Sequence, residues 1–192
     1  MLTENEIIAM QRQVVEEKYK SIYSPATYIG KKRYVFTARE LSEARITVHL
    51  PELFLDLPES IAKQKYPSEN RPQIIISSSD ISVNFAFTLL PEPTDDDEII
   101  EVRNDALNAM KRLYPQNTYS DTGVDVTVCS RIYAWYEYSG PTLDSEMYAL
   151  NAFMCIKDKL LHFLFNCPNE AHEQWKPVVL EVINSIVEDE KF

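Results

Sequence analysis

Apolar side chains recur along the chain with two different periods, and the changes of period mark out the elements. A period of two is typical of strands with one buried face, and residues 45–50 and 81–89 follow it. Spacings of three and four are typical of amphipathic helices, and residues 96–113 and 170–188 follow those. The pattern predicts strands at residues 33–39, 45–50, 73–78, 81–89, 124–129, 132–138, 147–156 and 160–166, and helices at 60–66, 96–113 and 170–188.

The two apolar runs at residues 147–156 and 160–166 predict the centre of the sheet. Both faces of each run are mostly apolar, as expected of strands that are covered on both sides. The residues Lys157 to Lys159 between the runs are too few for a parallel crossover, so the strands must pair antiparallel. Helix 170–188 then covers one face. We therefore predict an α+β fold, a three-layer α-β-α sandwich with a mostly antiparallel central sheet.

Residues 1–24 predict an N-terminal amphipathic helix, separate from a single α-β-α domain at residues 25–192. Apolar side chains recur at helical spacing from Ile7 to Tyr19. Thr3 and Glu6 have the spacing of a capping box, which stabilises a helix start. Two interpretations of this helix stay open: it packs on its own domain, or it binds a partner.

The order of elements resembles that of the Mog1/PsbP-like superfamily, including its DcrB-like bacterial group. The resemblance covers residues 33–188 and rests on four features: the early strand that ends at Leu50-Pro51, the strand pair around 74–76 and 81–87, the helix 96–113, and the closing hairpin with a helix that carries Trp175. It implies a non-enzymatic binding or assembly protein. Mog1-like members bind a small GTPase, and PsbP-like members support a photosynthetic complex. No binding residue of those proteins matches a position in this chain.

The charge of the chain excludes some partners. Thirty acidic residues against 19 basic residues give a net charge of −11. Nucleic-acid binding needs a basic face, and an anionic membrane repels an acidic protein, so we expect neither partner. The N-terminus has no uncharged apolar core of a signal peptide, and the three cysteines have no metal-type spacing. These features predict a cytoplasmic protein with reduced thiols.

Catalytic, cofactor and metal motifs are missing from the sequence. The three glycines are isolated, whereas a phosphate-binding loop needs them clustered. His172 has Lys176 four residues on, where a zinc helix would place a second histidine. The acidic run 95–98 is interpreted either as a helix cap or as a cation site. We expect no enzyme activity, no cofactor and no metal.

Aromatic and polar positions predict the interaction surface. Tyrosine combines an apolar ring with a polar tip and is frequent at interfaces, although the same side chains also suit a core face. The segment 65–72 is interpreted either as a binding loop or as a rigid connection. The candidate surface comprises Tyr66, Arg71, Tyr133, Trp135, Tyr136 and Tyr138.

The function expected from these features is a protein-interaction or assembly module. Its partner is expected to be another protein, with a homodimer compatible with the sequence. The alternative is a small-molecule or lipid-binding domain with a pocket between sheet and helix, near Trp135 and Tyr148.

Overall fold

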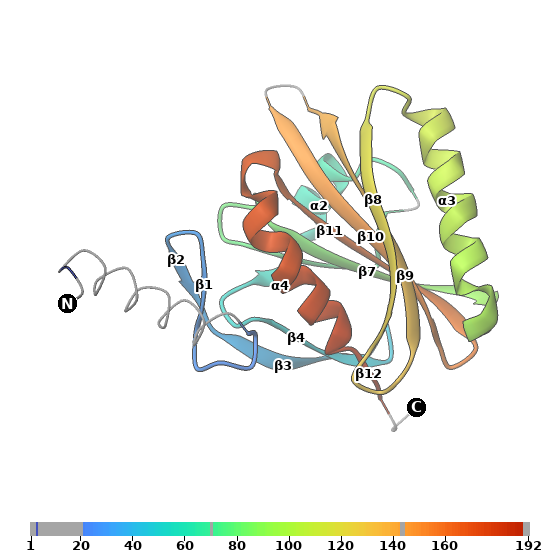
Figure 1. Ribbon diagram of the computed structural model, residues 1–192, viewed down its shortest axis with the longest axis horizontal. Helices are drawn as coiled ribbons and strands as arrows, with labels where there is room; N and C mark the ends of the chain where they lie inside the picture. The colour runs from blue at the N-terminus through green and yellow to red at the C-terminus, as the bar shows by residue number, and fades with distance from the viewer. Residues whose placement is uncertain (1–2, 4–20, 70, 143–144, 190–192) are drawn as a thin grey trace.

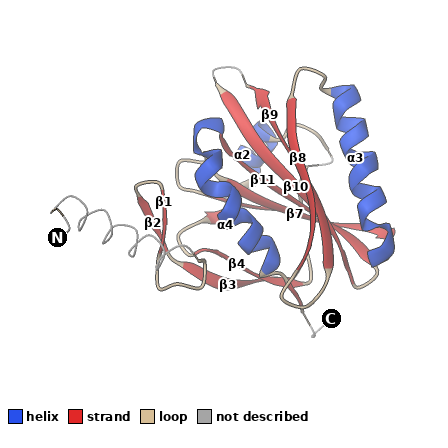
Figure 2. Cartoon of the chain, viewed as in Figure 1, coloured by secondary structure: helices blue, strands red, loops and turns tan. Residues whose placement is uncertain are grey.

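The computed structural model describes residues 3, 21–69, 71–142 and 145–189, so almost all of the predicted N-terminal helix lies outside the described residues. The described residues form one large antiparallel sheet with smaller elements on both faces (Figures 1 and 2). In spatial order the large sheet contains β5 (Leu55–Asp56), β6 (Ile74–Ser77), β7 (Asn84–Pro93), β11 (Lys159–Pro168), β10 (Glu146–Ile156), β9 (Ile132–Pro141) and β8 (Thr118–Val126).

One face of the large sheet is covered by α4 (His172–Asn184) and by a small three-stranded sheet. That small sheet has the order β12 (Val187–Glu188), β4 (Ile46–Pro51) and β3 (Phe36–Leu41), and the hairpin of β1 (Thr27–Ile29) and β2 (Lys32–Tyr34) precedes it. The core on this face is rich in aromatic rings, and Phe85 and Phe165 pack against Trp175 of α4.

The opposite face of the large sheet is covered by two helices. α3 (Ile99–Leu113), which follows the 3-10 turn η1 (Asp96–Glu98), packs on β9 and β10 through Ile99, Tyr136 and Phe153. α2 (Glu59–Lys65) lies near β6 and β7, where Ala62 packs with Ile75. The predicted three-layer α+β arrangement is therefore confirmed, with a small sheet added to the layer that contains α4.

The strands of the closing hairpin are the best-predicted elements. β10 and β11 pair antiparallel from Met147 opposite Pro168 to Ile156 opposite Lys159. Lys157 and Asp158 both have positive φ, at 47° and 59°, which is the backbone of the tight hairpin turn that two-residue connections favour.

β7 extends further than the sequence pattern indicated. Strand 81–89 was predicted to end before the prolines, yet β7 continues through Pro91 to Pro93. The reason is the short neighbour on one side: β6 pairs with β7 only as far as Phe87. Beyond that point one side of β7 is open, so a proline without an N–H removes no hydrogen bond from the sheet.

The C-terminal helix is shorter than predicted and is followed by a strand. α4 follows the 3-10 turn η2 (Asn169–Ala171) and ends at Asn184, after which Val187 and Glu188 pair with β4. The hydroxyl of Ser185 donates to the carbonyl of Val182 (2.7 Å) and accepts from the amide of His49 (3.0 Å). This serine therefore ends the helix and ties the chain to β4.

Candidate functional site

Two adjoining hollows open beside the β1–β2 hairpin. The first has a volume of about 420 Å³ and is lined by residues 32–35, 51–54 and 78–80. The second, of about 460 Å³, lies between the hairpin, the β6–β7 turn and the start of α4. Lys32, Tyr34 and Asp80 line both hollows, and we refer to the two together as the hairpin cleft. The volumes lie within the range typical of ligand sites.

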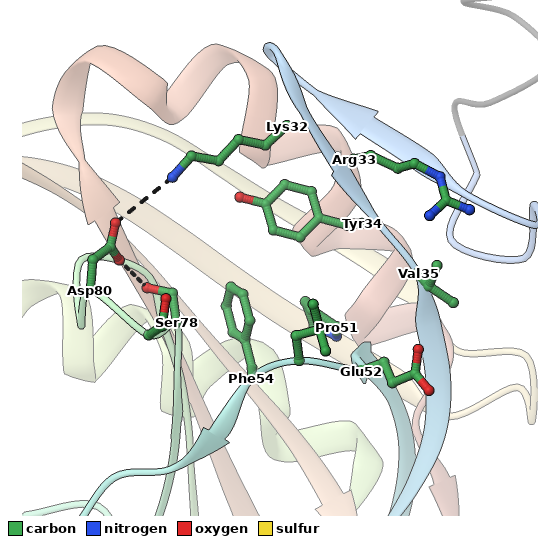
Figure 3. A pocket seen from close by; sticks show the side chains of 11 residues that line it. Lys32, Arg33, Tyr34, Val35, Pro51, Glu52, Phe54, Ser78 and Asp80 are labelled. Atoms are coloured by element: carbon green, nitrogen blue, oxygen red, sulfur yellow. Dashed lines mark hydrogen bonds and ion pairs between the residues drawn. The ribbon is translucent and has the colours of Figure 1, made fainter.

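Aromatic rings form one wall of the hairpin cleft. The ring of Tyr34 meets Phe54 edge-on, with centroids 6.1 Å apart, and meets Trp175 at 5.3 Å. Phe54 and Trp175 are 4 % and 3 % exposed, and both pack on Phe85 in the main core. Tyr34 is half-buried, so its ring is anchored from behind while its remaining surface borders the cleft (Figure 3).

A fixed carboxylate faces this aromatic wall. Asp80 lies in the turn between β6 and β7, and its Oδ1 accepts from the hydroxyl of Ser78 (2.6 Å), the hydroxyl of Ser82 (2.7 Å) and the amide of Ser82 (3.1 Å). These hydrogen bonds hold the pKa of Asp80 well below its usual range, because each favours the ionised form. The other oxygen, Oδ2, faces Lys32 at 3.8 Å (Figure 3).

The turn that carries Asp80 has a strained backbone. Ile81 has φ of 55°, a conformation that costs a β-branched residue about 1–2 kcal/mol. Its side chain is 41 % exposed, although it alternates in sequence with the buried Val83 and Phe85. The carbonyl of Ile81 accepts from Lys65 Nζ (2.5 Å) and from Asn84 Nδ2 (3.3 Å). These contacts hold a turn that local sequence disfavours, and strain of this kind concentrates at functional sites.

A second polar cluster joins α4 to β8, β9 and β10. The hydroxyl of Tyr148 donates to Glu137 (2.6 Å), and Lys176 donates to both Glu137 and Asp121 (3.1 Å each). The Lys176 ammonium also lies 5.1 Å from the centre of the Trp135 ring. Burial and the Glu137 carboxylate raise the pKa of Tyr148. Since each charge here is paired and each ring is covered, the cluster fastens the helix to the sheet.

Comparisons with known proteins place the fold. No protein-family model matches the chain, and no curated protein matches it in sequence. Cyanobacterial PsbP (CyanoP) from Synechocystis sp. PCC 6803 superposes with a TM-score of 0.57 at 12 % identity, over 80 % of this chain and 92 % of that one. LpqN, involved in cell envelope biogenesis of Mycobacterium tuberculosis, superposes with a TM-score of 0.52 at 14 % identity, over 83 % and 95 %.

This chain has the PsbP-like fold. Its seven-stranded antiparallel sheet with flanking helices matches those structures, which confirms the resemblance at the level of the fold.

The predicted aromatic surface lies mostly inside the domain. β8 pairs with the outer side of β9, so β9 is not an edge strand of the large sheet. Tyr133, Trp135 and Tyr136 are 0 %, 7 % and 2 % exposed. Burial raises the pKa of all three tyrosines of this strand, that of Tyr138 to about 12.

Tyr66 and Arg71 lie together at the end of α2, on the face opposite the hairpin cleft. The Nε of Arg71 donates to the carbonyl of Tyr66 (3.3 Å), and Asn166 donates to the Tyr66 hydroxyl (2.9 Å). Both side chains are half-buried. The structure therefore brings these two predicted residues together and separates them from the cleft.

The predicted pocket near Trp135 and Tyr148 is not one of the two hollows. Neither residue lines the hairpin cleft, and the Lys176 side chain occupies the space over the Trp135 ring. Of the residues that build the cleft, Trp175 was singled out from the sequence only as part of the family resemblance, and none was predicted to form a site. The lining residues come from four segments that are far apart in the chain, at residues 29–35, 51–54, 78–83 and 168–175, so no local spacing marks them.

No helix among residues 21–69, 71–142 and 145–189 combines the length and apolar character that a membrane crossing needs. The same part of the chain contains no group of three or more His, Cys, Asp or Glu side chains placed to hold a metal ion. The acidic run at 95–98 acts at a helix start, where Glu98 accepts from the amide of Asp95 (3.3 Å).

Proposed function

We propose that this PsbP-like domain is a non-catalytic binding module that holds a segment of another protein in the hairpin cleft. The observation that carries the proposal is the cleft itself, with its anchored aromatic wall and its fixed carboxylate. A wall of this kind keeps its shape without the partner, so little conformational entropy is lost on binding.

Apolar side chains at the rim favour a partner larger than a small molecule. Leu53 lines the cleft and is 83 % exposed. Leu55 on the neighbouring strand β5 is 69 % exposed. Exposed apolar side chains at or close in sequence to a concave site are typical of protein interfaces. A small molecule of matching volume is the second candidate for the same cleft.

Site-specific photo-cross-linking in the native host tests this function. A photoreactive amino acid replaces Leu53 at the cleft rim, and in the matched control it replaces Leu113 at the end of α3, which is 70 % exposed. We expect a discrete protein adduct from position 53 that the control lacks. Excess unlabelled wild-type chain should suppress the adduct, and excess Leu53→Glu chain should not.

An adduct pattern that is the same at positions 53 and 113 would overturn the protein-binding proposal. Protein adducts absent at both positions, together with a small molecule that co-purifies with the wild type and is lost from Leu53→Glu, would favour the second candidate.

A further inference from the structure

The hairpin cleft contains charges of both signs, and they differ in how firmly they are held. Asp80 Oδ1 accepts three hydrogen bonds within its own turn, so the carboxylate is fixed before any ligand arrives. Lys32 lies 3.8 Å from Oδ2, with 73 % of its side chain exposed. An exposed pair at that separation is weak, and a long lysine side chain moves away easily. Within this ion pair, the negative charge is therefore fixed and the positive charge is mobile.

The surroundings of Asp80 also favour a cation. The Asp80 side chain is 54 % exposed even with Lys32 beside it, so Oδ2 is accessible from the cleft. The Tyr34 ring borders the same space, and its pKa is raised by burial and by the Asp80 carboxylate; the phenol therefore stays neutral beside the carboxylate. Aromatic rings attract cations through their faces, and the net charge of −11 steers cations toward the molecule.

We infer that the hairpin cleft recognises an arginine side chain of the partner segment, with Asp80 Oδ2 accepting from the guanidinium, the Tyr34 ring packing beside it, and Lys32 displaced from the carboxylate. This inference rests on the proposed function and adds the chemistry of the ligand. Arginine suits the site better than lysine because its planar guanidinium combines hydrogen bonding to a carboxylate with stacking on an aromatic ring.

Lys32 acts as an internal competitor in this arrangement. When the cleft is empty the ammonium partly neutralises Asp80, and an incoming guanidinium replaces it. Removing the ammonium should therefore strengthen arginine binding, while removing the carboxylate should weaken it. A cleft that instead recognised an anion through Lys32 and its basic neighbours would respond in the opposite sense to both changes.

The test uses the full chain and two short probes that differ in one charge. Acetyl-Gly-Arg-Gly-amide is titrated against the protein, and acetyl-Gly-citrulline-Gly-amide serves as its neutral isostere. Binding is followed by NMR through the backbone amides of Ser79 to Ser82. We expect saturable binding of the arginine probe and binding of the citrulline probe that is about tenfold weaker or more.

Three variants separate the roles of the charges. Asp80→Asn should weaken the arginine probe about tenfold, and Lys32→Met should strengthen it about two- to tenfold. Asp97→Asn removes the same charge at an exposed position on η1 and should change affinity less than twofold. Lys32→Met alters an exposed side chain, so it remains informative even if Asp80→Asn disturbs the turn.

Equal binding of both probes, or weaker arginine binding in Lys32→Met, overturns the inference. The proposed function fails separately. One outcome is that the protein adduct at position 53 forms both in the otherwise wild-type chain and in Asp80→Asn while the arginine probe does not bind. In that case the module binds a protein without recognising an arginine side chain. If the arginine probe binds as expected but no protein adduct forms at position 53, the cation site is supported and the proposed protein partner is rejected.

Discussion

Single residues in this domain take their ionisation from the groups around them. Asp80 is exposed enough to meet solvent, yet three hydrogen bonds from Ser78 and Ser82 keep it charged. His162 on β11 is the opposite case. Its Nε2 lies 2.9 Å from Asn151 Oδ1, and its ring stacks on Phe153 with centroids 4.8 Å apart. Burial lowers its pKa to about 4, because desolvation disfavours the charged ring.

The lowered pKa of His162 predicts a loss of stability in acid. An unfolded histidine titrates near pH 6.5, so between pH 6.5 and pH 4 the unfolded chain binds the extra proton and the folded chain does not. The contribution is complete above pH 6.5 and decreases by about 2.5 kcal/mol between pH 7 and pH 4.5. His162→Gln should remove that part of the slope in urea unfolding at the two pH values. An NMR titration of the His162 ring with a midpoint near 6.5 would contradict this account.

Strand β8 shows how an element takes its structure from a neighbour. Its residues are mostly exposed on both faces and include few apolar side chains, so residues 116–123 gave a loop-like pattern. Pairing with β9 nevertheless makes it a strand from Thr118 to Val126. Gly123 lies opposite Trp135 in this pairing, and a Cβ at that position would lie 2.5 Å from ring atoms of Trp135. The large ring covers the small residue across the strand pair.

Gly123→Ala is therefore expected to destabilise the domain. The added methyl must displace the Trp135 ring, which also supports Lys176 of α4, and overpacking of this kind costs about 1–3 kcal/mol. Thr122→Ala changes the adjacent exposed residue of the same strand and should alter stability by no more than about 0.5 kcal/mol. Chemical unfolding of both variants checks the difference. Equal stabilities would show that the ring yields without cost.

Ion pairs and hydrogen bonds around β12 join segments that are far apart in the sequence. Arg131, between β8 and β9, pairs with Asp96 (3.3 Å) before α3 and with Glu188 (2.6 Å) in β12. The amide of Asp189 donates to the carbonyl of Arg45 (2.9 Å). β12 thus pairs with β4 of the small sheet and contacts the β8–β9 turn of the large sheet through Glu188.

Removing Arg131 should loosen the C-terminal strand. Arg131→Met leaves Asp96 and Glu188 without their cation. Because the arginine is 38 % exposed, solvent screening limits the loss to about 1 kcal/mol. Hydrogen exchange at β12 and β4 should accelerate more than exchange at β10. Lys63→Met breaks an exposed pair within α2 and should leave β12 unchanged. Unaltered exchange at β12 in Arg131→Met would show that backbone pairing alone holds the strand.

The layers of the fold and its central strands follow from the amino-acid sequence alone. The doubly apolar runs 147–156 and 160–166 can be buried only in the middle of a sheet, and the short turn at Lys157 and Asp158 imposes their antiparallel pairing. The spacing of apolar residues indicates which side chains are buried, and this spacing can be recognised within a single segment of the chain.

The edges of the large sheet and the hairpin cleft depend on tertiary contacts. Whether the Tyr133 strand is an edge depends on β8, and whether Val187 forms a strand depends on β4, so neither follows from local pattern. Lys32, Phe54 and Asp80 carry no shared spacing, yet the β1–β2 hairpin, the β4–β5 connection and the β6–β7 turn bring them to one hollow. A binding site of this kind arises from contacts between distant segments, so no single segment of the sequence reveals it.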